Sequence, residues 1–286
     1  MKLTTCAAAL VAIGLLSSVA QAADFSDTSI SYRYGTQFRE PFNDKDISKN
    51  IFALMHISGY KYGTNFFNVD FLMSDKKDPA SLTQTSGAQE AYVVYRHTLD
   101  IGKLRGSAIK FGPFRGLGAT FGFDVNTKND VGYNSRKRML VVGPTLMWDV
   151  PGVFNTSILI LKESNAPSGA FPPISTVTGR YSYKTHAALA ANWSIPIGSM
   201  PLAFEGYGLI IAPKGKDEVG APTATETHID MQLMWDVGSS TGLAAKNTLK
   251  LGVEYEYWKN KFGNKASIAG PGSFAKTPMI RAEYHF

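Results

Sequence analysis

Ionisable side chains recur at every second position in several stretches of this 286-residue chain. The clearest runs are Glu226-His228-Asp230 and Arg281-Glu283-His285. A carboxylate beside an imidazole can activate water as a general base, and the imidazole of His228 could also ligate a metal. The zinc-protease motif H-E-x-x-H does not occur in the chain, so the residue types permit hydrolytic or metal chemistry without specifying it.

The elements that would position these side chains are extended strands. In the last ten residues, Ile280, Ala282, Tyr284 and Phe286 alternate with charged residues such as Arg281. Successive side chains of a strand point to opposite faces, so the apolar and charged sets separate. In a soluble sheet the apolar face would be the core. In a membrane barrel the apolar face meets lipid and the charged face lines the lumen.

Twelve such segments are predicted, at residues 30–38, 51–60, 66–74, 90–99, 119–125, 139–148, 156–161, 180–193, 202–211, 225–235, 249–257 and 277–286. In the first segment, the alternation places Phe38 with Ile30 and Tyr34, opposite Arg33. Pro144 lacks a backbone donor and is unfavourable in the middle of a sheet. Connections after odd-numbered segments tend to be long and polar and those after even-numbered segments shorter, as in bacterial outer-membrane barrels.

The charged residues cluster in the middle of the strands, opposite aromatic and aliphatic faces. Aromatic residues near segment ends suit the two membrane interfaces: Tyr34, Trp148, Trp193, Trp235, Tyr257 and Phe286. A secreted β-sandwich or lipocalin-like barrel is the alternative. We predict an all-β protein, a 12-stranded antiparallel transmembrane β-barrel of a Gram-negative outer membrane, with residues 23–286 as its single domain. It would have no transmembrane helix, because no later stretch approaches 18 apolar residues.

The N-terminus predicts export. Lys2 precedes an apolar run that ends in Ala20-Gln21-Ala22, which is the pattern of a secretory signal peptide cleaved after residue 22. Cys6, the one cysteine, lies inside that segment, so disulfide or thiolate-metal chemistry is not expected in the mature chain. Lys and Arg number 29 against 23 Asp and Glu, without a long basic block, so nucleic acid is not an expected partner.

One stretch supports a family resemblance: FGPFRGLGATFGFDVNTKND, residues Phe111 to Asp130. Together with the turn at Leu99 to Leu104 and the aromatic strand NFFNVDFLMSD at 65–75, it resembles the nucleoside-specific channel (Tsx) family of outer-membrane proteins. The resemblance implies a monomeric barrel with a narrow channel for nucleosides. Aromatic side chains would stack on the base, and carboxylates or amides would bond ribose hydroxyls. Phe66, Tyr92 and Tyr207 are the best aromatic candidates.

The predicted lumenal set holds acids, bases and aromatics, and its mixed sign favours a neutral polar solute over an ion-selective pore. The same groups could instead pair across strands and fill a small barrel. The set is Arg33, Phe66, Asp70, Tyr92, Arg96, Asp124, Arg180, Lys184, His186, Glu205, Tyr207, Glu226, His228, Asp230, Glu254, Glu256, Arg281 and Glu283.

We therefore predict a passive outer-membrane channel for small polar solutes, most favourably nucleosides, with no catalytic residue, metal or cofactor. Its expected partners are outer-membrane lipid, lipopolysaccharide and the barrel-assembly machinery, which would recognise the terminal strand ending at Phe286. An outer-membrane phospholipase or protease, and a plugged structural or adhesive barrel, are the alternatives.

Overall fold

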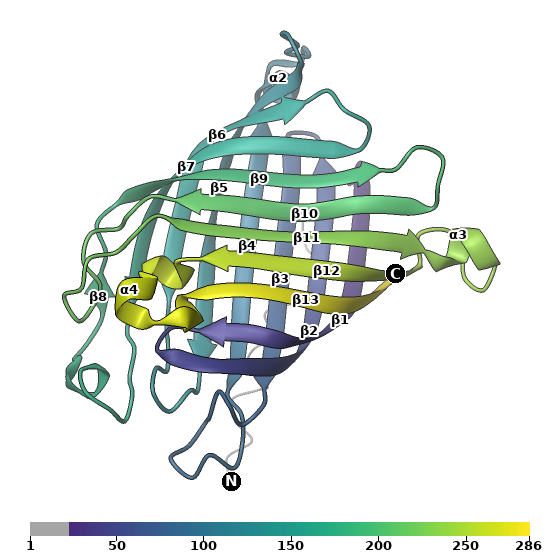
Figure 1. The fold of residues 1–286 in the computed structure, drawn as a ribbon. Coiled ribbons are helices and arrows are strands. Elements are labelled where there is room, and N and C mark those ends of the chain that lie inside the picture. The colour runs from purple at the N-terminus through teal and green to yellow at the C-terminus, as the bar shows by residue number, and fades with distance from the viewer. Residues whose placement is uncertain (1–22) are drawn as a thin grey trace.

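The computed structural model describes residues 23–286 and shows a barrel closed from one antiparallel sheet (Figure 1). Each long strand pairs with its neighbours in the chain, and β1 pairs with β13 to close the ring. The two-residue strand β8 pairs with β7 outside the ring. Twelve long strands therefore enclose a lumen, as the sequence predicts. The predicted signal peptide, with Cys6, lies outside the described residues.

The ring strands are β1 (Phe25–Glu40), β2 (Asn43–Tyr60), β3 (Gly63–Ser74), β4 (Gln89–Asp100), β5 (Phe114–Lys128), β6 (Arg138–Trp148), β7 (Val153–Asn165), β9 (His186–Pro196), β10 (Leu202–Ile211), β11 (Glu226–Asp236), β12 (Leu249–Lys259) and β13 (Phe274–His285), and the short strand is β8 (Tyr181–Ser182). The helical segments are α2 (Ile101–Arg105), η2 (Ile174–Thr176), α3 (Val237–Thr241), η3 (Lys261–Gly263), α4 (Ala266–Ala269) and η4 (Pro271–Ser273). Among residues 23–286, no helix has the length and apolar character needed to span a bilayer.

The two ends of the barrel differ. The long-loop end carries the connections at 75–88, 129–137, 166–185, 212–225 and 260–273, and the turn end carries both described chain termini. In Figure 1, α4 and β8 mark the long-loop end and α3 and the C-terminus mark the turn end. Two turn-end connections contain short helices, α2 and α3, which Asp100 and Asp236 cap by accepting backbone N–H bonds.

The first two strands are longer than predicted. β1 has 16 residues and β2 has 18, so a two-residue turn replaces the expected long polar loop between them. A register shift in β1 between Gly35 and Phe38 also turns Phe38 inward, where it is 3% exposed. The predicted placement of Phe38 with Ile30 is therefore wrong, because a bulge adds a residue and inverts the alternation beyond it.

Pro144 is accommodated by a gap in one ladder. On one side, Pro144 is opposite Ala119 of β5. On the other, pairing with β7 passes from Val142↔Ile160 to Thr145↔Ser157, skipping Gly143 and Pro144. The proline thus needs no donor toward β7, and β6 remains one continuous strand.

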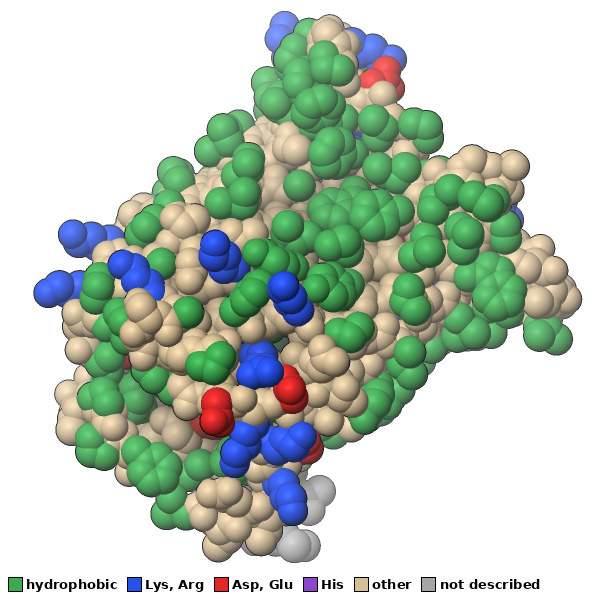
Figure 2. Space-filling view, in the orientation of Figure 1, with side chains coloured by type: hydrophobic (Ala, Val, Ile, Leu, Met, Phe, Trp, Pro, Cys, Tyr) green, Lys and Arg blue, Asp and Glu red, His purple; other side chains and the backbone are tan. Residues whose placement is uncertain are grey.

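On the face shown in Figure 2, apolar side chains gather over the middle of the strands. Exposed side chains there include Ile30, Phe52, Val253 and Ile280. Near the turn end the outward positions are aromatic, with Trp148 against Phe154 and Trp193 stacked on Phe204. Two apolar clusters lie inside the barrel instead: Met139, Val141, Leu159, Leu161, Ala188 and Ile211 in one, and Phe38, Ile47, Ile51 and Met279 in the other.

Candidate permeation path and its charged clusters

In a single-walled barrel, the more buried of the two faces of a strand is the face toward the lumen. By this criterion and by strand register, every predicted site residue except Arg180 and Lys184 lies on the inner wall. Residues directly opposite each other in a ladder share a face, so Asp70 and Tyr92 confirm each other's orientation, as do Asp230 and Glu256. The inner wall is therefore polar and charged opposite an apolar exterior.

Arg180 and Lys184 are exceptions, and their predicted pore-lining positions are wrong. The segment expected as one strand from 180 to 193 divides into β8 and β9, and residues 183–185 between them lie outside any strand and reset the alternation. Arg180 lies in the loop before β8 and donates to the backbone oxygen of Arg136 at 2.9 Å. Lys184 is exposed, whereas Tyr183 is buried and His186 begins the inward face of β9.

A mid-barrel cluster joins four strands through ion pairs. Arg33 of β1 reaches past β2 to Asp70 at 2.6 Å and past β13 to Glu254 at 3.4 Å. Arg281 of β13 pairs with Glu254 at 2.6 Å and with Glu283 at 2.5 Å. Buried charges are costly unless they are paired, so this arrangement fixes the side chains and leaves little net charge at the cluster.

A second cluster lies on β4 and β5. Arg96 pairs with Asp124 at 2.5 Å, and the Tyr92 hydroxyl donates to the other carboxylate oxygen of Asp124 at 3.0 Å. Lys137, just before β6, donates to the Tyr92 hydroxyl at 3.1 Å. The sequence identified Arg96, Tyr92 and Asp124 but not Lys137, because Lys137 is outside any predicted strand.

A third cluster, at the long-loop end, was not predicted. Glu40 contacts three lysines: Lys49 at 2.6 Å, Lys261 at 3.4 Å and Lys128 at 3.7 Å. Lys128 also pairs with the loop residue Asp78 at 2.9 Å. Because β1 and β5 are not neighbours in the ring, this cluster crosses the mouth of the lumen. Extending the alternation of β2 backward from Ile51 would have found Lys49. The other partners of Glu40, Lys128 at the end of β5 and Lys261 in η3, have no local signal.

The long loops carry two carboxyl groups in unusual surroundings. Burial and the proximity of Asp78 raise the pKa of Asp130 to about 7. Burial also raises the pKa of Glu218, which accepts hydrogen bonds from the hydroxyls of Tyr133 and Tyr183. The two hydrogen bonds of Glu218 hold the loops at 129–137, 166–185 and 212–225 together at the long-loop end.

Aromatic residues on the inner wall differ in how far they reach into open space. Tyr207 is 40% exposed although its position on β10 faces inward, so its ring projects into the lumen. It makes an edge-on contact with the ring of His228, which stacks on Trp258 at 3.9 Å. Phe66 and Tyr92 are less exposed and lie on the β3–β4 side.

A G-x-S-x-G run, Gly238 to Gly242, was not among the expectations from sequence. It forms α3 and its C-terminal glycine at the turn end. The hydroxyl of Ser240 donates to the backbone oxygen of Asp236 at 2.9 Å, and it accepts from the indole of Trp235. A hydroxyl held in this way serves the helix turn, and within residues 23–286 no histidine hydrogen-bonds to it.

No protein-family model matches the chain, and neither does any curated protein sequence. Solved structures with a similar fold are outer-membrane barrels. The KdgM porin has 10% identity and a TM-score of 0.43, with 90% of this chain and 99% of that chain covered. The translocator domain of the autotransporter NalP from Neisseria meningitidis has 12% identity and a TM-score of 0.41, with 99% and 97% covered.

The Pseudomonas aeruginosa protein OpdK, solved with vanillate, has 11% identity and a TM-score of 0.39, with 91% of this chain and 98% of that chain covered. At these identities and TM-scores, the likenesses bear on neither solute nor mechanism.

Proposed function

We propose that this protein is an outer-membrane channel for the passive passage of small polar solutes, with nucleosides as the favoured class. The observation that carries the proposal is the inversion of the barrel: apolar side chains cover the outside while charged and polar side chains cover the inner wall. A closed barrel satisfies every backbone group between strands, which is what hydrocarbon requires of a strand-built protein.

The distribution of charge supports a neutral solute. Arg33, Arg281 and Arg96 are each paired with carboxylates, so the inner wall carries no ring of a single sign. Tyr207 presents an aromatic face to open lumen, while nearby Asp230 and Glu205 supply oxygen acceptors. A nucleoside needs that combination: a face on which the base stacks and acceptors for ribose hydroxyls. The resemblance of Phe111 to Asp130 to the Tsx family favours the same solute class.

Blockade of single-channel current by thymidine or adenosine tests the nucleoside step. Stacking on one aromatic ring is worth about 1–3 kcal/mol, so Tyr207→Leu is expected to weaken blockade by roughly fivefold or more. Tyr284→Leu is the matched control, because Tyr284 lies on the outward face and is also exposed. Saturable blockade of unchanged affinity in Tyr207→Leu would contradict the assignment of Tyr207. Current without any blockade would support the channel proposal and refute nucleosides as its solutes.

Basic residues on the outer rim support lipopolysaccharide as a proposed partner. Basic side chains lie at outward, exposed positions near the long-loop end, where lipopolysaccharide phosphates would meet the barrel: Arg138, Lys162, Lys259 and Lys276. Co-purification of lipopolysaccharide should fall when Arg138 and Lys162 are changed together to Gln, and unchanged co-purification would refute the contact. We further propose a monomer, which the mass of the refolded protein in detergent would check.

A further inference from the structure

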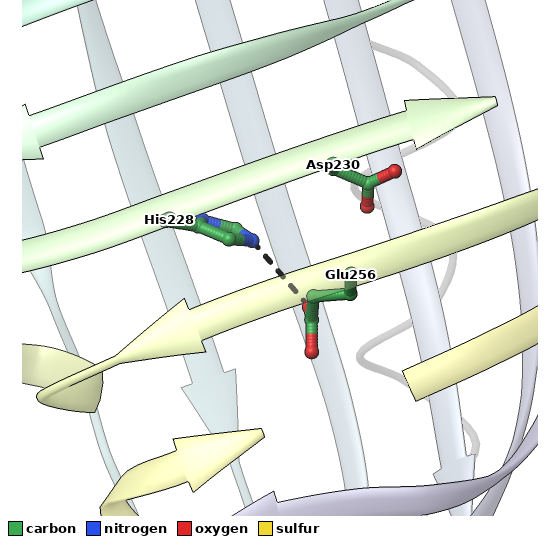
Figure 3. Close-up of side chains that lie close together, drawn as sticks. All are labelled: His228, Asp230 and Glu256. Carbon is green, nitrogen blue, oxygen red and sulfur yellow. Dashed lines mark ion pairs between the residues drawn. The ribbon is translucent and has the colours of Figure 1, made fainter. Parts of the chain in front are cut away.

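Three side chains on the adjacent strands β11 and β12 converge inside the barrel: His228, Asp230 and Glu256 (Figure 3). One ligand atom from each lies within 4.8 Å of the others, and this is the one such group among residues 23–286. Asp230 and Glu256 are directly opposite in register, and His228 is two residues before Asp230 on the same face. Regular strand geometry therefore brings the three together without a special loop.

The two carboxylates have unused bonding capacity. Glu256 is 8% exposed, and its Oε1 atom is buried without a hydrogen-bond partner. Asp230 is 5% exposed, and within the described part of the chain no side-chain hydrogen bond or ion pair reaches it. A buried carboxylate oxygen without a partner is costly, so a cation bound at Glu256 Oε1 would stabilise this wall.

The nearby arginines do not fill this role. Arg33 is engaged by Asp70 and Glu254, and Arg281 by Glu254 and Glu283. Their positive charges are therefore largely balanced by carboxylates outside the group. The ion pair from His228 Nε2 to Glu256 Oε2, at 3.4 Å, is the one direct contact within the group (Figure 3).

The donor set is one imidazole nitrogen and two carboxylate oxygens, which suits a borderline divalent ion. Metal–ligand distances of about 2.1 Å in a tetrahedral site put donors roughly 3.4 Å apart, which is the separation from His228 Nε2 to Glu256 Oε2. Trp258 stacks on the His228 ring with an interplanar angle of 7°, which fixes the plane of the imidazole. The indole N–H of Trp258 is itself held, donating to Glu226 at 2.6 Å.

We propose that His228, Asp230 and Glu256 bind a divalent transition-metal cation of the zinc class within the lumen. The remaining coordination position would be open to water, with the Tyr207 hydroxyl nearby at 3.4 Å from His228 Nε2. A metal at this site would contradict the expectation from sequence that none is bound. The sequence places His228 and Asp230 on one face of a strand, but it does not show that Glu256 lies opposite Asp230.

Isothermal titration calorimetry, with ZnCl2 added to the refolded, chelator-treated barrel, tests the site. It measures zinc binding independently of any channel activity. The expected result is one zinc ion per chain, with affinity reduced about tenfold or more in His228→Ala and in Glu256→Gln. Asp230→Asn preserves side-chain shape and provides a third variant if either of the others fails to fold. Strand content by circular dichroism shows which variants are folded.

His285→Ala is the matched control. His285 is also lumenal and also has two carboxylate partners, Asp27 at 2.9 Å and Glu283 at 3.2 Å. These partners contact opposite ring nitrogens, so one ion cannot take all three, and His285→Ala should bind zinc as the parent does. The proposal is overturned if the parent protein gives no stoichiometric binding, or if folded His228→Ala or Asp230→Asn binds zinc as tightly as the parent does.

Discussion

Replacing Arg33 with Met should destabilise the barrel by removing the centre of the mid-barrel cluster. The Arg33 side chain is 10% exposed, and its partners Asp70 and Glu254 are 21% and 0% exposed. Removing one member of a buried pair costs about 3–5 kcal/mol. Glu254 keeps Arg281, and Asp70 is partly hydrated by the lumen, so we expect a smaller loss, about 2–3 kcal/mol in the free energy of unfolding.

Urea unfolding of the refolded protein in detergent, followed by tryptophan fluorescence, measures this loss. Arg39→Met is the matched control, because Arg39 pairs with Asp46 at the rim with side chains 26% and 49% exposed. Such a pair is worth about 0–1 kcal/mol. The double variant Arg33→Met/Asp70→Asn should recover roughly 1 kcal/mol of the loss. Equal losses in Arg33→Met and Arg39→Met, or no recovery in the double variant, would refute the view that the lumenal charges are paired for stability.

Two further outcomes are expected. Because the pKa of Asp130 is raised to about 7, its contribution to loop packing is complete below the ordinary carboxyl pKa near 4 and is lost as pH rises through about 7. Amide exchange at 129–137, corrected for intrinsic rates, should therefore be faster at pH 8 than at pH 5, and Asp130→Asn should abolish the difference; identical pH dependence in the variant would count against this. Deleting Phe286, which is 74% exposed at the turn end, should reduce assembly in cells while leaving unassisted refolding into detergent unchanged, and normal assembly would exclude Phe286 as the recognised residue.

The sequence predicts much of this fold because a barrel wall is built from a local rule. Period-two alternation fixes which side of a strand faces lipid, and it placed Asp124 and Glu254 on the inner wall. The rule fails where pairing is irregular. The bulge before Phe38 and the break between β8 and β9 each shift the alternation, and neither has a local signature in side-chain type.

Contacts across the lumen are beyond the reach of such a rule. Glu40 and Lys261 are separated by most of the chain, and they meet because the ring closes between β1 and β13. The convergence of Glu256 on His228 likewise depends on the register of β11 and β12, which hydrophobic patterning alone does not fix to the residue. Alternation can therefore identify an inner-wall residue, whereas its partner follows only from closure and register.

The central claim, that the inner wall surrounds a water-filled path for neutral solutes, is tested most directly by single-channel recording of the refolded protein in a KCl gradient. We expect discrete current steps with a reversal potential near zero, because the wall carries charges of both signs and its arginines are paired with carboxylates. A strongly cation- or anion-selective current would contradict the proposed charge balance. The absence of any current from a correctly folded barrel would contradict the path itself.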